Sequence, residues 1–433
     1  MTTQPVPARR RLHPAWIVAV VTLGALVAGA AFRSSTGVLL EPIEREFGWS
    51  RATTSGAVSL NLVLYGVVAP FAAALMESWG VRKVVTIALA VVGIASGMTI
   101  VMTQRWQLWL LWGLLIGTGT GAMALVLGAI VANRWFDERR GLVTGLFSAA
   151  NATGQLIFLP LIAAAAEGPG WRYAAGVTAV LALLMAALVA VFLRDRPADI
   201  GTLPYGATEP PPPEVRRYAN PASQALAVLR RASRTWPFWA LVLTFFVCGW
   251  STNGLVQTHF VSAAHDHGML ATTAAGLLAV VGIFDLVGTV ASGWLTDRMD
   301  SRYLLAAYYG LRGLSLLTVH ELLASTVQPA LWVFIVFYGL DWVATVPPTV
   351  ALCRQFYGSE DSGVVFGWTY ASHMIGAGVG ASVAGGIREA TGSYHGAWIV
   401  AAGLCVVACV CALTIPRRGA PVRFEMAMEP SDP

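Results

Sequence analysis

The stretch LMESWGVRK (Leu75–Lys83) has a counterpart in LTDRMDSR (Leu295–Arg302), and the two copies place Glu77 and Asp297 at equivalent positions. Two other sets of residues are also matched between the two halves of the chain, at nearly the same separation in sequence as these two acids. At the same offset Arg134 and Phe136 are matched by Arg354 and Phe356, and at nearly the same offset Gly141, Gly145 and Gly154 are matched by Gly363, Gly367 and Gly376. Three matches at nearly one offset indicate a duplicated unit.

The composition around this repeat is that of a membrane protein. Of the 433 residues 56% are hydrophobic and 12% are charged, whereas soluble domains carry about 25% charged residues. This deficit excludes a soluble enzyme, a disordered chain and a nucleic-acid binder. An odd number of cysteines, all in or beside apolar stretches, indicates reduced thiols rather than a disulfide framework: Cys248, Cys353, Cys405, Cys409 and Cys411.

Twelve stretches are long and apolar enough to cross a bilayer, which takes about 20 residues per helix. They cover residues 15–40, 51–76, 82–103, 106–133, 140–165, 172–193, 237–262, 271–296, 303–323, 329–353, 362–387 and 395–415. With the repeat, they predict an all-α membrane protein of twelve transmembrane helices in two pseudo-symmetric six-helix bundles. The bundles comprise residues 15–193 and 237–416, with tails at 1–14 and 417–433.

The distribution of basic residues predicts the orientation of the chain. If the N-terminus is cytoplasmic, 21 of the 28 lysines and arginines lie on the cytoplasmic side, as the positive-inside rule requires. The sequence therefore predicts a plasma (inner) membrane protein with both termini in the cytoplasm. The linker 194–236 contains Pro210–Pro213, and this run of prolines predicts an extended segment. A short amphipathic helix is expected at 222–234, on the anionic inner leaflet.

The twelve spans, the central loop and the two acidic–basic loops resemble the major facilitator superfamily. Its loop pattern is small-x-Leu-x-Asp-Arg-x-Gly-x-Arg. The first copy matches at Ala73, Leu75, Glu77, Gly80, Arg82 and Lys83, with Ser78 in place of arginine, and the second at Gly293, Leu295, Asp297, Arg298 and Arg302, with Asp300 in place of glycine. We expect Glu77, Arg82, Asp297 and Arg298 to form a conformational latch. A solvated turn is the alternative.

Within that superfamily the first half resembles the monocarboxylate and oxalate–formate porters. FGWSRA (Phe47–Ala52) and RWFDERRGLVTGLFSAANATG (Arg134–Gly154) carry this resemblance. It implies that Arg33, in FRSSTGVLLEP, joins proton-linked anion binding. The alternative is an arginine that reaches the outer headgroups.

Asp285 lies 12 residues before Asp297, about 18 Å along a helix, and hence near the midplane. GIFDLVGT around it resembles helix 8 of those porters, in which an arginine follows the aspartate by four residues. Thr289 stands at that position. This departure leaves open a neutral substrate, or an anion held from elsewhere.

Three more ionisable residues, Arg312, Asp341 and His373, reach similar depth. Such groups are costly in lipid and usually face a cavity or a partner. We expect Arg312 to be a structural partner of Asp285 or Asp341. The carboxylate left without a cation would carry protons, so Asp285 and Asp341 are both candidates for proton coupling. His373 would contact substrate, relay the proton or be a satisfied core histidine.

Polar residues on other spans complete the candidate substrate site: Asn61, Tyr65, Asn151, Gln155 and Asn253. Their alternative role is to hold helices together. His259, His265, Asp266 and His267 gather at the outer end of the seventh span. For these the sequence favours an exposed loop or external gate over a transition-metal site.

Together these features predict a secondary active transporter of a small organic solute, favouring a mono- or dicarboxylate, that works by alternating access with proton coupling. An exporter of a neutral or cationic metabolite or drug is one alternative, favoured by Thr289 and the paired acids. A non-transporting sensor is another. No enzymatic activity, cofactor or metal is expected, and no phosphate-binding loop points to ATP. The expected partners of this monomer are its small-molecule substrate, protons and the bilayer, without nucleic acid.

Overall fold

The computed structural model describes residues 13–49, 51–150, 158, 162, 170–210 and 220–417. Within the helices it leaves undescribed the side chains of residues 31–38, 40, 41, 51, 52, 55, 271 and 272. The predicted site residues Asn151 and Gln155 lie outside the described residues, as does the side chain of Arg33.

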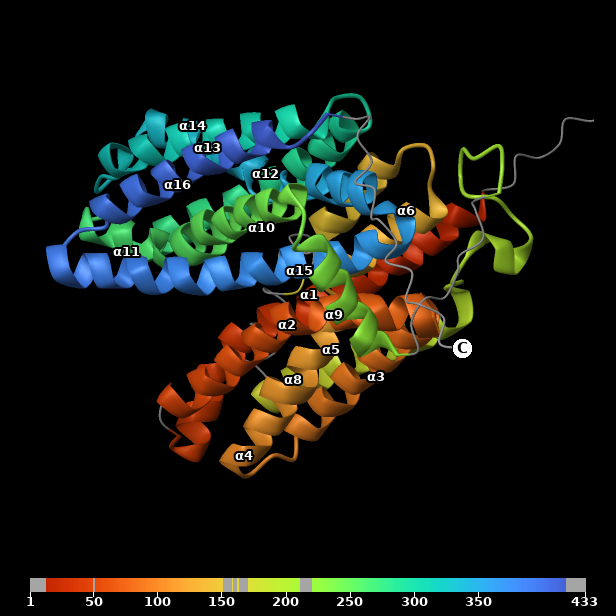
Figure 1. The fold of residues 1–433 in the computed structure, drawn as a ribbon. Coiled ribbons are helices and arrows are strands. Elements are labelled where there is room, and N and C mark those ends of the chain that lie inside the picture. The colour runs from red at the N-terminus through yellow and green to blue at the C-terminus, as the bar shows by residue number, and fades with distance from the viewer. Residues whose placement is uncertain are drawn as a thin grey trace, which may run out of the picture.

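The first half of the chain is a series of apolar helices (Figure 1). They are α1 (Pro14–Phe47), α2 (Arg51–Trp79), α3 (Val81–Thr99), α4 (Arg105–Leu108), the π-helix η1 (Trp109–Ile116), α5 (Gly117–Ala122), α6 (Leu125–Trp135), the helical residues 140–150 and α8 (Trp171–Phe192). The segments α4 to α6 follow one another and together occupy the predicted span 106–133.

The second half begins with a linker and repeats the pattern. Its elements are η2 (Pro197–Ile200), α9 (Pro221–Ala232), α10 (Trp236–Gly249), the π-helix η3 (Trp250–Gln257), α11 (Thr258–Asp266), α12 (Ala271–Thr296), α13 (Ser301–Leu322), α14 (Pro329–Asp341), α15 (Val346–Thr391) and α16 (His395–Thr414). In the described part of the chain the one pairing of extended segments is a bridge between Phe136 and Tyr205.

Eight helical segments of the described chain are long and apolar enough to span a membrane. One of them, Pro329–Thr391, has 63 residues and covers two predicted spans. Gly358 divides it, because its φ of 73° lies in the left-handed region that glycine adopts readily. Each of the twelve predicted stretches is mainly helical where the structure describes it, with non-helical residues at 100–103, 123–124 and 342–345.

The helices direct large apolar side chains outward, toward lipid, and small side chains inward, where helices pack closely. In α8 the large side chains of Val180, Leu184 and Val191 are 57–58% exposed, whereas Ala179 and Ala186 are buried. Large apolar side chains therefore face outward, and small residues let neighbouring backbones approach. A helix that spans the hydrocarbon interior satisfies the backbone groups of its middle turns within itself, which that interior demands.

Two groups of helices result, which we call the N-terminal bundle (α1 to α8) and the C-terminal bundle (α10 to α16). The loops 79–81 and 296–301 and the linker helix α9 lie at one end, which we call the basic end; α4 and α11 lie toward the opposite end. The bundles meet at the basic end and diverge toward the opposite end (Figure 1).

The amphipathic linker helix begins one residue before the predicted stretch and packs on protein. Its N-cap residue, Asn220, accepts a hydrogen bond from the backbone of Ser223 at 2.7 Å. The apolar face of α9 contacts both α2 and α15, and its residue Ala225 is fully buried. Trp368 of α15 donates from Nε1 to the carbonyl of Ala225 at 3.1 Å. The linker helix thus bridges the two bundles.

Candidate functional site

A buried ion pair lies inside the C-terminal bundle. Nε of Arg312, on α13, donates to Oδ2 of Asp341, at the end of α14, at 2.6 Å, and the side chains are 0% and 6% exposed. Nη2 of Arg312 also donates to the backbone carbonyl of Asp341 at 2.6 Å. Of the two aspartates the sequence offered, Arg312 therefore pairs with Asp341.

The remaining donors of Arg312 are used as well. Nη1 lies 3.3 Å from Sγ of Cys248 and 3.3 Å from Oγ of Ser251. The rings of Tyr309 and Tyr338 lie 5.6 and 6.0 Å from the guanidinium carbon. The guanidinium thus joins α13 to α14, α10 and η3, a structural arrangement that leaves it no face for a ligand.

Asp285, on α12, is the second buried carboxylate, and it is 1% exposed. Its Oδ1 accepts a hydrogen bond from the hydroxyl of Thr289 at 2.7 Å and another from the backbone N–H of Val343 at 3.0 Å. No ion pair described for this part of the chain includes Asp285. Thr289, four residues on, supplies a neutral donor where the related porters are expected to carry arginine.

Thr289 also lies where the two bundles touch. A Cβ placed on Gly145, in the N-terminal bundle, would lie 2.7 Å from the backbone oxygen of Thr289 and 3.2 Å from Cα of Gly293. Only a residue without a side chain permits this approach. Asp285 is therefore one helical turn, about 6 Å, from the crossing of the bundles.

The repeat places a second close crossing between α2 and α15. A Cβ on Gly367, the counterpart of Gly145, would lie 2.6 Å from Cα of Pro70. A little farther from the basic end, the rings of Tyr65 and Tyr370 meet edge to face, with centroids 5.7 Å apart. Related glycines thus let each bundle approach the other at two places.

Among the predicted latch residues, Asp297 joins the bundles directly. Its Oδ1 accepts the backbone N–H of Gly141 at 2.6 Å, and its Oδ2 accepts that of Leu142 at 3.1 Å. These donors belong to the first turn of the helix at 140–150, whose N–H groups have no partner within the helix. Asp297 thus caps a helix of the other bundle.

The contacts described for the other predicted latch residues do not cross the interface between the bundles. Glu77 pairs with Arg134 at 2.6 Å. The backbone N–H of Arg82 donates to Oδ1 of Asp195 at 2.7 Å, and the guanidinium of Arg298 lies 4.0 Å from the centroid of the Trp294 ring.

Arg354, the counterpart of Arg134, does not repeat the pairing with Asp297. Its Nη1 donates to the backbone carbonyl of Asn133 at 2.7 Å, across the interface of the bundles. The repeat in the sequence identified Arg354 as the counterpart of Arg134 but did not predict this contact between the bundles.

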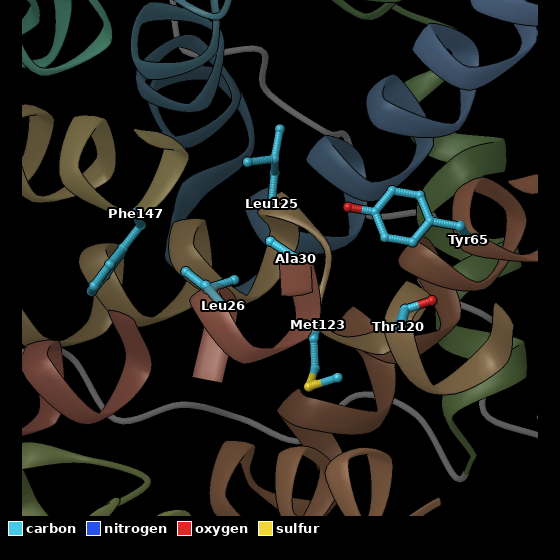
Figure 2. Close-up of a pocket in the computed structure, with 8 residues that line it drawn as sticks. Leu26, Ala30, Tyr65, Thr120, Met123, Leu125 and Phe147 are labelled. Atoms are coloured by element: carbon cyan, nitrogen blue, oxygen red, sulfur yellow. The ribbon is translucent and has the colours of Figure 1, made fainter. Parts of the chain in front are cut away.

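Two predicted substrate contacts of the N-terminal bundle, Tyr65 and Asn61, have different surroundings. Tyr65 points into a small cavity between α1, α2, α5, α6 and the helix at 140–150 (Figure 2). Its lining residues are Leu26, Gly29, Ala30, Tyr65, Thr120, Met123, Leu125 and Phe147. Asn61 instead donates to the carbonyl of Trp112 at 2.7 Å, inside its own bundle. Arg33 follows Ala30 by three residues along α1.

The predicted contacts of the C-terminal bundle lie on η3 and α15. Asn253 is half-buried within the π-helix η3, a helix type that often marks functional sites. The ring of His373 stacks on Tyr370, with centroids 5.7 Å apart, and its buried Nδ1 has no hydrogen-bond partner among the described residues. Tyr370, which sequence analysis missed, therefore connects His373 to Tyr65 across the interface.

The histidines of the seventh span have separate surroundings. His259 contacts the hydroxyl of Tyr394 at 3.1 Å and the carbonyl of Ala381 at 2.8 Å. Asp266 pairs with Arg388 at 2.7 Å, and the exposed His265 shares a surface pocket with both. His267 lies instead beside His320, with ring centroids 4.9 Å apart.

Comparisons with known proteins agree with this architecture. The chain is 25% identical over 387 residues to an uncharacterized MFS-type transporter, YcxA, of Bacillus subtilis, covering 86% of this chain and 88% of that protein. It is 26% identical over 386 residues to monocarboxylate transporter 13 of Rattus norvegicus, covering 88% and 84%. The crystal structure of the E. coli fucose:proton symporter FucP matches with a TM-score of 0.68 at 16% identity, over 93% of this chain and 99% of that one.

The family model of the Major Facilitator Superfamily matches residues 21–370, and a second match covers 260–429. The first match alone spans more than half of the chain. It includes both copies of the acidic–basic loop and the buried carboxylates of the C-terminal bundle. The protein therefore belongs to the Major Facilitator Superfamily of transporters, in the branch that resembles the monocarboxylate transporters.

Proposed function

We propose that the protein carries a small organic anion of the mono- or dicarboxylate type together with protons, by alternating access. It acts as a monomer in the plasma membrane. Its basic end lies in the cytoplasm, because most lysines and arginines belong to the loops there. Transport consists of a rocking of the two bundles about a site near the midplane.

In this orientation the conformation is closed to the cytoplasm. The glycine crossings, the cap from Asp297 and the bond from Arg354 all join the bundles between the basic end and mid-depth. Toward the opposite end the bundles diverge. Substrate and protons would therefore enter from outside, and the next step in the cycle would separate these contacts.

The observation that carries proton coupling is the position of Asp285. It is buried and makes no described ion pair, and Thr289 links it to the crossing at Gly145. Protonation would replace a charged acceptor with a neutral one and weaken the bonds from Thr289 and Val343. α12 would then be freer to move against the helix at 140–150. Asp341, paired with Arg312, would have a structural part.

The substrate class is supported by the relatives and by the distribution of cations. Several similar proteins are named as monocarboxylate transporters. Arg312 is fully engaged with Asp341 and its neighbours, so it cannot hold a substrate anion without breaking a buried pair. Arg33, close in sequence to the Tyr65 cavity, would then be the cation for the substrate, with Tyr65, Asn253 and His373 as polar contacts.

The test is a pH measurement outside de-energised cells that express the protein. Adding the transported acid should alkalinise the medium, and Asp285→Asn and Arg33→Gln should each abolish the signal. The exposed residues Glu389 and Arg105 supply matched controls, because Glu389→Gln and Arg105→Gln should leave it intact. A flat response across monocarboxylates, dicarboxylates and neutral metabolites would contradict symport.

Proton-driven export of a neutral or cationic compound is the second candidate, and Thr289 favours it. A threonine beside Asp285 leaves that carboxylate uncompensated, as suits a cationic cargo. In everted vesicles energised with a proton gradient, such an exporter would accumulate a cationic dye, and Asp285→Asn would stop the uptake. Arg33→Gln would have no effect, which separates this outcome from anion symport.

A further inference from the structure

Three histidines and a glutamate meet at the opposite end of the C-terminal bundle. His267 follows α11, His320 and Glu321 end α13, and His395 begins α16. The ring centroid of His320 lies 4.9 Å from that of His267 and 4.5 Å from that of His395. Among the described residues, the ligand atoms of His320, Glu321 and His395 all lie within 4.8 Å of one another.

We propose that this cluster binds a late transition-metal ion of the zinc class, with imidazole nitrogens and one carboxylate oxygen as ligands. Neutral imidazole suits zinc, copper and nickel, and zinc sites take three or four nitrogen, sulfur or oxygen ligands from side chains of this kind. The proposed ligands are His267, His320, Glu321 and His395. The ligand atoms of His320, Glu321 and His395 already lie within 4.8 Å of one another, and the neighbouring ring of His267 would supply the fourth ligand.

Two nitrogens of the cluster are suited to a metal, for different reasons. Nδ1 of His267 lies 2.8 Å from the backbone carbonyl of Ala263 and must carry its proton to donate there. The lone pair of that ring is then on Nε2. A carbonyl partner on the other nitrogen is the usual second contact of a metal-bound histidine. Nδ1 of His320 is buried without a hydrogen-bond partner, and a metal would satisfy it.

Ring packing alone is the competing explanation, and it accounts for less. It would explain the contacts between the rings, but it leaves Nδ1 of His320 buried without a partner. It also gives no role to Glu321, which brings an oxygen to the same point. The cluster lies apart from Asp285 and from the Tyr65 cavity, so the metal would brace the end of one bundle by joining α11, α13 and α16.

The test is zinc binding to the purified full-length chain in detergent, prepared without a polyhistidine tag and stripped with a chelator. Competition with a chromophoric chelator should give one Zn²⁺ per chain. His320→Ala and His395→Ala should each weaken binding by more than about tenfold. The matched control is His265→Ala, which removes an exposed histidine from the same end of the molecule and should bind as the wild type does.

A second readout separates a lost ligand from a lost fold. Zn²⁺ should raise the thermal midpoint of the wild type by a few degrees, because it binds only the folded chain; Mg²⁺ should not. His395 is exposed, so His395→Gln should match the metal-free wild type in its midpoint and lack the zinc-dependent rise. Zinc binding that survives all the substitutions, or its absence from the wild type, would overturn the proposal.

Discussion

The carboxylate of Asp297 accepts the backbone N–H of Gly141 at 2.6 Å, so that the end of α12 caps a helix of the other bundle. Its counterpart in the repeat, Glu77, pairs with Arg134 inside its own bundle. Two equivalent acids at the basic end therefore have different tasks. One holds the bundles together, and the other joins α2 to α6.

Removing the cap should open the basic end. Loss of a helix cap costs about 1 kcal/mol, a roughly fivefold change in a two-state population. In a background without native cysteines, Ile130→Cys reports opening, because Ile130 packs against Gly363 across the interface. We expect Asp297→Ala to raise the rate of maleimide modification at this cysteine severalfold.

The control for this experiment is Asp300→Ala. Asp300 also caps a helix, accepting the N–H of Arg302 at 3.0 Å, but that helix is its own α13. This substitution should leave the modification rate unchanged. Equal rates in the two variants would show that the cap from Asp297 does not hold the bundles together.

Filling the glycine crossing should prevent closure of the basic end. A side chain on Gly145 would meet the backbone of Thr289, and backbone cannot give way as a flexible side chain can. We expect Gly145→Val to trap the protein open at the basic end, with loss of transport and an elevated modification rate at Ile130→Cys. Gly276→Ala is the control, since nothing lies within 4 Å of a Cβ placed there. Normal transport by Gly145→Val would refute this account of the crossing.

The pair Arg312–Asp341 should stabilise the fold rather than carry protons. Breaking a buried pair by removing one partner typically costs about 3–5 kcal/mol, because the other charge is left buried alone. Arg312→Met or Asp341→Leu should therefore lower the thermal midpoint strongly, and the double substitution should recover much of the loss.

Asp285→Asn is to be compared with the substitutions at Arg312 and Asp341. It should lose proton coupling and keep nearly the wild-type midpoint, because Asp285 has no described ion-pair partner. A strong loss of stability in Asp285→Asn, together with a mild effect of Arg312→Met, would reverse the assigned roles.

An ion pair at the opposite end should make stability depend on acid pH. Glu46 lies 2.5 Å from Nη1 of Arg172, and hydrogen bonds from Arg172 and Trp171 hold the pKa of Glu46 below its ordinary value. Since the folded state lowers this pKa, the stabilisation is present above the unfolded pKa of about 4.3 and is lost as the pH falls through the folded value.

Glu46→Gln should therefore lower the thermal midpoint slightly at pH 7, because the pair is about two-fifths exposed and exposed pairs contribute little. Its difference from the wild type should shrink as the pH falls below about 4. The check is the thermal midpoint of both proteins between pH 7 and pH 3.5. A difference that stays constant over this range would count against the ion pair.

The repeat and the apolar stretches predicted the helices, because the bilayer leaves few other ways to satisfy a backbone. They could not predict that Asp297 and Glu77 differ, since identical offsets say nothing about which contacts a closed conformation makes. The partner of Arg312 was left open for a related reason: Asp285 and Asp341 lie at similar depths, and the choice depends on how the helices are rotated.

The meeting of side chains from distant helix ends was not predicted. His267, His320 and His395 lie far apart along the chain, and no pattern in the sequence brings them together. The linker helix shows a different limit, since an amphipathic pattern is the same whether its apolar face meets lipid or protein. Arg33, Asn151 and Gln155 remain predictions for the substrate site.

The placement of α9 bears on where the chain can be divided. Arg231 of α9 pairs with Asp361 at 2.8 Å, and Thr235 shares a hydrogen bond with Tyr357 at 2.7 Å, so the helix is anchored to the half that follows it. Its contacts with α2 then offer the preceding half a docking edge. If the gene were split ahead of Asn220, the second fragment would carry α9. This helix would dock on α2 of the first fragment, so the two co-expressed fragments should reassemble.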